Sequence, residues 1–260
     1  MLQRLWRAWA GRTAQAPPPA DDWQAAFARV PVLDNWPARE RERLQQLAGQ
    51  FLADKAIEPA GDTAVSRIDA LAIALQAALP VLELGLDWYR GWHAVVLYPD
   101  EFRSRFEEVD EAGVVHEVED WRSGESWTAG PLILSLAEVA AGGQGHGHNV
   151  VIHECAHKLD QLDGDSNGRP PLHPDMDPAA WSSAFAAAYR DLGRRALRHL
   201  RTVLDPYGAQ SPAEFFAVAS EMFFDDPPGL QRGYPAVYAQ LALFYRQDPA
   251  AHWALPAEVP

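Results

Sequence analysis

The spacing of apolar side chains along the chain changes character twice. Three amphipathic helices are predicted where apolar residues recur every three to four positions, over residues 22–30, 38–54 and 66–79. Short apolar segments between turn residues then predict strands, over residues 93–98, 114–118 and 131–136. Helical spacing returns after residue 149, and later helices are expected near 178–200, 212–225 and 234–247. Helices, a small sheet and helices again predict an α+β fold.

The start of the chain differs from the rest. Residues 1–20 carry Arg4, Arg7 and Arg12 among apolar residues and end in a proline run. No apolar stretch of about seven residues follows these charges, so a secretory signal is not predicted. We expect a flexible tail over residues 1–20 and a single domain over 21–260. Within that domain, residues 21–79 form a helical part and residues 80–250 a core that carries the chemistry described below.

Composition excludes several classes of protein. With 48% hydrophobic residues and 10 tryptophans, the chain has enough apolar surface for a sizeable core. Its only cysteine, Cys155, can form no internal disulfide, which fits the reducing cytoplasm. A net charge of −14 disfavours nucleic acid and anionic membranes as partners. No apolar run approaches the roughly 20 residues that span a bilayer.

The most specific local pattern is His153-Glu154-Cys155-Ala156-His157, an H-E-x-x-H motif. On a helix, positions four apart share a face, so His153 and His157 can bind one zinc ion. Glu154 lies beside them, where it can act as general base on the water that the ion holds. Asn149 is a favourable N-cap for such a helix, and apolar residues flank the motif on both sides. The alternative is a surface helix with a solvated His/Glu patch.

Catalytic zinc needs a third protein ligand, and two carboxylates downstream are candidates. Glu214 and Glu221 are seven residues apart, hence on nearly the same face of a predicted helix. Ser211, Pro212 and Glu214 also read as a capping box, which would use Glu214 for the helix terminus. If Glu214 is the ligand, Glu221 can support a ligand histidine from behind. Spacing alone leaves the choice open.

Several motifs together resemble the Mlc titration factor A family of bacterial zinc metallopeptidases. The similar segments are 130–135, 148–152, 153–160, 205–208 and 212–218, and the resemblance extends over about residues 80–245. Cys155 inside the motif departs from the family pattern.

The resemblance implies a zincin-like metallopeptidase with a small sheet and an active-site helix, as in the catalytic domain of anthrax lethal factor. It implies that His153, His157 and Glu214 bind one zinc ion and that Glu154 is the catalytic glutamate. It also matches Tyr207 to a family tyrosine, which we expect to stabilise the oxyanion. Family members act as aminopeptidases on small substrates and bind the glucose repressor Mlc.

Three functions therefore compete. The first is a zinc peptidase, an aminopeptidase on short peptides. The second is a regulatory protein that sequesters a transcription repressor and has latent or secondary peptidase activity. The third is a protein in which zinc only stabilises the fold, which Glu154 disfavours because a structural site needs no general base.

Other residues near the motif have two interpretations each. Tyr207 lies in Asp205-Pro206-Tyr207-Gly208, which also reads as a β-turn. His146 and His148, in a Gly-rich loop, are weak candidates as metal ligands. Asp160 can orient a ligand imidazole or be a solvated residue of the last helical turn. Residues 130–136 are expected to be the strand that pairs with the substrate backbone.

Overall fold

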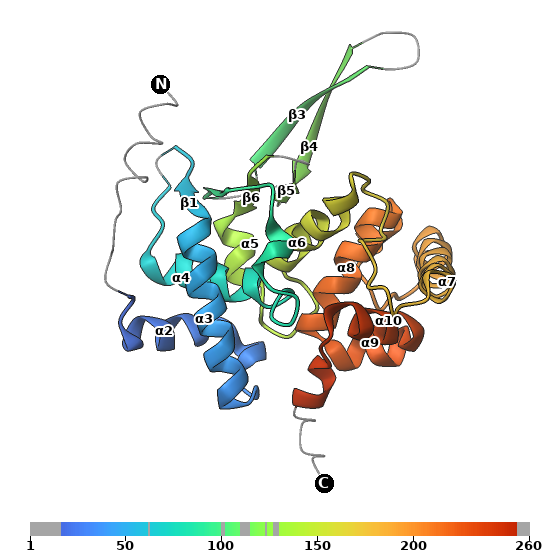
Figure 1. Cartoon of the computed structure of the whole chain (residues 1–260). Helices are drawn as coiled ribbons and strands as arrows, with labels where there is room; N and C mark the ends of the chain where they lie inside the picture. Colours follow the sequence, from blue (N-terminus) through green and yellow to red (C-terminus); the bar gives the residue numbers. More distant parts are fainter. Residues whose placement is uncertain are drawn as a thin grey trace.

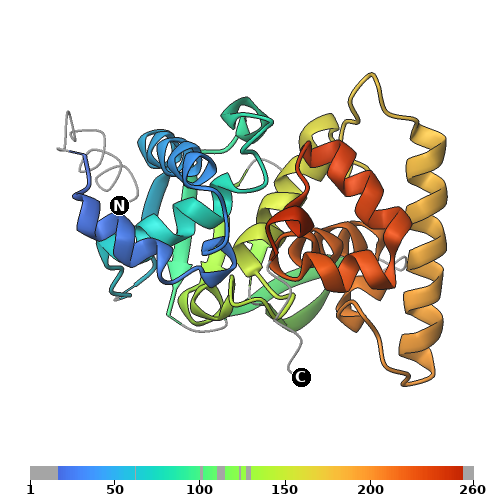
Figure 2. The ribbon, with the colours of Figure 1, turned by 90° about the horizontal axis from the view of Figure 1, so that it is seen from below.

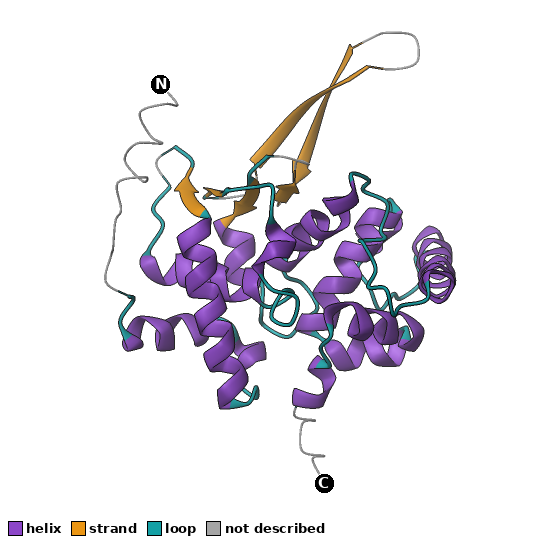
Figure 3. Ribbon diagram, in the orientation of Figure 1, coloured by secondary structure: helices purple, strands orange, loops and turns teal. Residues whose placement is uncertain are grey.

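The computed structural model describes residues 17–61, 63–99, 102–109, 115–122, 124–126 and 130–253, with only the backbone of the strands between 102 and 126. Helices make up most of it, with one small sheet and a separate two-stranded ribbon (Figure 3). This mixture agrees with the predicted α+β class. Most of the predicted N-terminal tail lies outside the described residues. No helix in the described part of the chain is long and apolar enough to cross a membrane.

Three helices of the first half lie where the apolar spacing predicts them. They are α2 (Ala20–Phe27), α3 (Ala38–Asp54) and α4 (Arg67–Ala78). Helix α4 begins at a capping box in which Ser66 Oγ accepts from Asp69 N and Asp69 Oδ2 accepts from Ser66 N. Such a box satisfies two backbone donors that a helix start leaves unpaired.

The sheet has the strand order β1-β2-β6-β5. Its strands are β1 (Ala56–Pro59), β2 (Ala94–Tyr98), β5 (Gly124–Ser126) and β6 (Leu132–Ser135). β1, β2 and β6 run parallel, and β5 is antiparallel to β6. β3 (Phe102–Val109) and β4 (Val115–Arg122) pair with each other in a ribbon that extends away from the body (Figure 1). The predicted strand 114–118 falls on the start of β4, with residue 114 outside the described residues.

The prediction that residues 130–136 pair with substrate is wrong. Strand β6 is an interior strand, because β2 and β5 pair with its two edges. All four of its residues are buried. The outer strand on this side of the sheet is β5, which also packs against helix α6.

The second half of the chain is helical. Its helices are α5 (Leu136–Ala141), α6 (Val150–Asp160), α7 (Pro178–Leu197), α8 (Pro212–Asp225), α9 (Pro227–Gly233) and α10 (Pro235–Tyr245). Figure 2 shows α6 between the N-terminal helices on one side and α7 to α10 on the other. It contacts α4, β5, β6 and α8. One continuous core, from Trp23 to Tyr245, packs around it.

Candidate metal centre

Helix α6 carries the H-E-x-x-H motif through the interior of the molecule. Asn149 caps its start, where Asn149 Oδ1 accepts a hydrogen bond from Ile152 N at 3.1 Å. Every residue of the helix except His153 is buried. The Cys155 thiol belongs to this core, and burial raises its pKa to about 12. The surface-helix alternative is therefore wrong.

Helix α8 brings Glu214 to the two histidines. Ser211 Oγ caps this helix by accepting from Glu214 N at 3.1 Å, and Pro212 occupies its first turn. The Glu214 carboxylate does not complete a capping box. It turns toward α6, with Oε2 3.1 Å from His153 Nε2 and 3.3 Å from His157 Nε2.

The three side chains converge on one point. The Nε2 atoms of His153 and His157 are 3.2 Å apart, close to the two separations from Glu214 Oε2. Tetrahedral zinc with bonds of about 2.0–2.1 Å would hold its ligand atoms about 3.3 Å apart. Two imidazole nitrogens and one carboxylate oxygen are also zinc's common donors. These residues therefore fit a zinc ion, and they form a group that could hold a metal ion.

Glu221, the competing candidate, lies behind His153. Its Oε1 is 2.7 Å from His153 Nδ1, and its Oε2 accepts from Asn149 N at 2.6 Å. An acceptor at Nδ1 keeps the ring proton there and leaves Nε2 free to bind a metal ion. Burial opposes protonation of His153, but the carboxylates around it, Glu221 first, outweigh it and hold its pKa well above the usual range.

Glu154 is buried beside the three converging donors. Its Oε2 has no hydrogen-bond partner among the described residues. Burial raises the pKa of Glu154 above its ordinary value, although His153 and His157 act in the opposite direction. A carboxyl with a free oxygen and a raised pKa is suited to take up and return a proton.

Tyr207 stands on η4 (Pro206–Ala209), a single turn of 3₁₀-helix. Asp205 Oδ1 caps this turn by accepting from Tyr207 N at 2.8 Å. The Tyr207 ring centroid is 6.0 Å from that of His153, and 38% of the residue is exposed. The interpretation of this segment as a turn is therefore confirmed, and the turn places the Tyr207 ring near the candidate ligand His153. The role of its hydroxyl at the oxyanion stays a prediction.

Asp160 is fully buried, so the alternative of a solvated residue in the last helical turn is wrong. Its Oδ2 accepts from Gly168 N at 2.8 Å, which ties the end of α6 to the following loop. Gly168 in turn lies against Pro212, where an added Cβ would be 2.2 Å from the carbonyl oxygen. This chain of contacts fixes the start of α8, and hence Glu214, relative to α6.

The Gly-rich loop before α6 is held by residues that the sequence did not single out. Asp225 Oδ2 accepts from His146 N at 2.8 Å and from Gly147 N at 2.7 Å. His148 lies between two carboxylates, with Nε2 2.9 Å from Glu138 and Nδ1 3.2 Å from Glu221. Hydrogen bonding to Glu221, and then to Glu138, outweighs burial and raises the pKa of His148 to about 9. His148 thus supports Glu221 and lies outside the converging donors.

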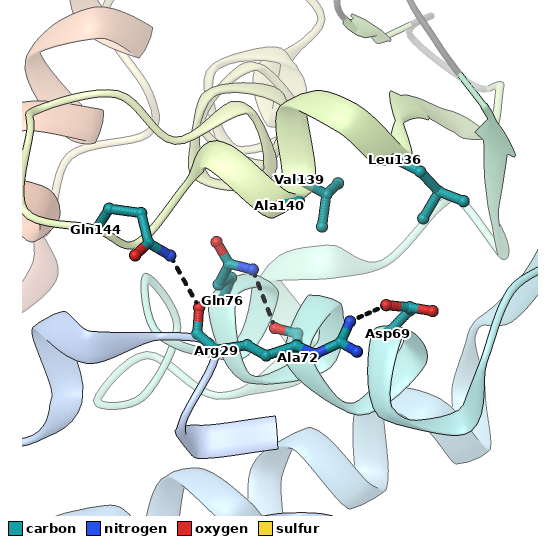
Figure 4. Close-up of a pocket in the computed structure, with 8 residues that line it drawn as sticks. All are labelled: Arg29, Asp69, Ala72, Gln76, Leu136, Val139, Ala140 and Gln144. Carbon is teal, nitrogen blue, oxygen red and sulfur yellow. Dashed lines mark hydrogen bonds and ion pairs between the residues drawn. The ribbon is translucent and has the colours of Figure 1, made fainter. Parts of the chain in front are cut away.

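A cavity of about 270 Å³ lies elsewhere, between α4 and α5. Asp69, Ala72 and Gln76 of α4 line it opposite Leu136, Val139 and Ala140 of α5, with Arg29 and Gln144 at its sides (Figure 4). None of the candidate metal ligands borders it.

Comparison with known proteins shows the family to which this chain belongs. The sequence pattern of the glucose-regulated metallo-peptidase M90 family matches residues 3–246. The chain is 37% identical to Mlc titration factor A of Enterobacter sp. (strain 638) over 229 residues, which cover 87% of this chain and 86% of that protein. It is 37% identical to Mlc titration factor A of Escherichia fergusonii over 242 residues, covering 92% and 89%. The chain therefore belongs to the glucose-regulated metallo-peptidase M90 family.

Proposed function

We propose that this chain is a zinc-dependent peptidase with a zincin-like core, acting as an aminopeptidase on short peptides. The observation that carries the proposal is the convergence of His153, His157 and Glu214 beside the unpartnered oxygen of Glu154. A metal that only stabilised the fold would not need a buried carboxyl next to its ligands.

Each residue then has a distinct role. His153, His157 and Glu214 would hold zinc, which when bound supplies a Lewis acid for the substrate carbonyl and the attacking water. Glu154 takes the proton from that water and passes it to the leaving amine. Tyr207 donates a hydrogen bond to the oxygen that becomes negative.

Strand β5 offers the peptide a place to bind. It is the outer strand of the sheet and packs against α6. A peptide that adds to such an edge is held by main-chain hydrogen bonds, whatever its sequence. The peptide bond would then lie along the helix that carries Glu154.

To test the proposal, the rate of peptide hydrolysis is compared between the zinc-loaded natural chain and the zinc-loaded Glu154→Gln variant. A panel of aminoacyl and internally quenched peptide substrates separates exo- from endo-cleavage. We expect aminoacyl substrates to be cleaved by the natural chain and about a thousandfold more slowly by the variant at equal zinc content. Zinc in both proteins and hydrolysis in neither would contradict the peptidase.

A second role is proposed from the name that the relatives share. Each is called Mlc titration factor A, and we propose the repressor Mlc as a partner of this chain in the cytoplasm. The activity would then be secondary to sequestering the repressor. Co-purification of Mlc with the Glu154→Gln variant would support this role. Failure of the two proteins to co-purify at micromolar concentrations would contradict it.

The continuous core from Trp23 to Tyr245 supports a single domain over 21–260, with a mainly helical part over 21–79, which also contains strand β1, and the catalytic core over 80–250. We propose that these parts fold together, because one apolar cluster connects them.

A further inference from the structure

An exposed surface of mixed basic and apolar character lies at the end of α7 and in the loop that follows. We define this α7-end surface as Leu197, Arg198, Leu200, Arg201 and Val203. Leu197 is 85% exposed, Leu200 52% and Val203 44%. Both arginines are exposed as well. Large apolar side chains gathered on a surface in this way are typical of binding sites.

The charge of this surface contrasts with that of the whole chain. The chain has a net charge of −14, yet residues 190–207 contain five arginines and only two acidic residues. Arg194 and Arg195 share one ion-pair partner, Asp191. Within the part of the chain that the structure describes, no ion pair involves Arg198 or Arg201. Two unpaired positive charges thus accompany the exposed leucines.

A short stretch of chain, residues 204–207, links the α7-end surface to the candidate metal centre. Leu204 is buried and anchors the loop directly after Val203. Three residues later Tyr207 lies beside His153, on the turn η4 that packs against α7 and α8. A polypeptide that extends from the candidate metal centre along this stretch would then reach the α7-end surface.

We propose that the α7-end surface binds an acidic segment, with at least one apolar residue, of the polypeptide whose peptide bond lies at the metal centre. The inference rests on the proposed peptidase function and gives it a substrate class. Arg198 and Arg201 attract the carboxylates, while Leu197, Leu200 and Val203 contact the apolar side chain. An acidic protein needs such a local positive surface to accept an acidic substrate, because its overall charge repels one.

The test compares two peptides that differ only in the segment flanking the cleavage site. In the acidic peptide this segment contains Glu and Asp, and in the neutral peptide it contains Gln and Asn. We expect the zinc-loaded natural chain to cleave the acidic peptide with at least fivefold higher kcat/KM at low salt. The ratio of kcat/KM for the acidic peptide to that for the neutral peptide should fall toward one in about 0.5 M salt, because salt screens surface charges. Arg198→Glu/Arg201→Glu should abolish it while the neutral peptide is cleaved as before.

Matched variants separate this surface from general charge. Arg39→Glu/Arg90→Glu changes the net charge equally at two other exposed arginines and should keep the preference. Leu197→Ala should weaken binding of the acidic peptide severalfold, whereas Leu243→Ala, which truncates a leucine that is 55% exposed on α10, should not. A preference that survives Arg198→Glu/Arg201→Glu, or is lost equally in both double variants, would overturn the proposal.

Fluorescence anisotropy of the same labelled peptides makes the result independent of hydrolysis. Tighter binding of the acidic peptide that depends on Arg198 and Arg201 would support the surface even if no peptide were cleaved and the peptidase proposal failed. Equal binding of both peptides, with light scattering showing a dimer that Arg198→Glu/Arg201→Glu dissociates, would overturn the proposal in favour of a second copy as occupant.

Discussion

Glu221 Oε1 lies 2.7 Å from His153 Nδ1. This nitrogen is on the opposite side of the imidazole from Nε2, which faces Glu214 and His157. Both oxygens of Glu221 accept, one at His153 Nδ1 and the other from Asn149 N. Helix α8 thus provides one candidate metal ligand, Glu214, and also the carboxylate that contacts another, His153 of α6. A single helix controls most of the geometry of the site.

Glu221→Gln is expected to weaken zinc binding by about 10- to 100-fold. An amide has one accepting oxygen, so its NH₂ group would confront either the ring N–H or the Asn149 N–H. Competition with a chromophoric chelator measures the affinity. Glu83→Gln, on the surface and paired with Arg43, is the control and should bind zinc as the natural chain does. Unchanged affinity in Glu221→Gln would show that His153 needs no support from behind.

Tyr207→Phe should lower kcat by about 100-fold and leave zinc content unchanged. The ring remains beside His153, and only the hydroxyl that would stabilise the oxyanion is lost. Steady-state kinetics and metal analysis on the same preparation measure the two quantities. Parallel loss of zinc and activity would instead assign Tyr207 a structural role.

Gly168→Ala should destabilise the fold by several kcal/mol and weaken zinc binding. Gly168 has φ +76°, and its new Cβ would meet the Pro212 carbonyl, which cannot move without shifting the start of α8. Gly164→Ala is a matched control, because Gly164 has φ +100° with no atom within 4 Å of a Cβ. It should cost only the backbone strain, about 1 kcal/mol. Urea denaturation compares the two, and equal losses would contradict a role for the contact with Pro212.

The sequence predicted the parts of this site that depend on local chemistry. Asn149 and Ser211 start the two site helices as expected, because side-chain capping involves neighbouring residues only. The choice between Glu214 and Glu221 was not accessible, since both occupy one face of α8 and only the docking of α6 distinguishes them. The contact of Asp160 with Gly168 likewise depends on the path of a loop.

Errors in the predicted fold have similar origins. β1 was not predicted, because it has only four residues, none of them fully buried. Helix α9 was also missed, because Pro227, Pro228 and Gly229 read as a turn, although prolines fit the first turn of a helix. Strand β6 was predicted in place, but its neighbours in the sheet come from distant parts of the chain.

Asp69 should make stability depend on pH at the acidic end. Burial alone would raise the pKa of Asp69, but hydrogen bonds from Ser66 and the Arg29 guanidinium outweigh it and hold the pKa below the usual 3.8. Because the pKa is lower in the folded state, the ionised carboxylate stabilises the fold at pH values above the pKa that Asp69 has in the unfolded chain. This contribution to stability disappears as the pH falls through the pKa of Asp69 in the folded state.

Asp69→Asn should therefore cost about 1 kcal/mol at pH 7, and the difference from the natural chain should shrink as pH falls through the lowered pKa of folded Asp69. Urea denaturation at several pH values measures it. Asp34→Asn, at an exposed residue, should show no such dependence. A constant difference across this range would mean that Asp69 acts through packing alone.

The candidate metal ligands His153 and His157 lie on α6, and Glu214 lies on α8. About fifty residues of chain separate these helices, so the three side chains meet only when α6 and α8 have docked. An unfolded chain offers no such set, and an ion that binds here selects the folded state. At 100 times its dissociation constant, an ion adds about 2.7 kcal/mol to the free energy of unfolding. The metal supply of the cell would then govern how long each molecule survives proteolysis, and with it the abundance of the protein.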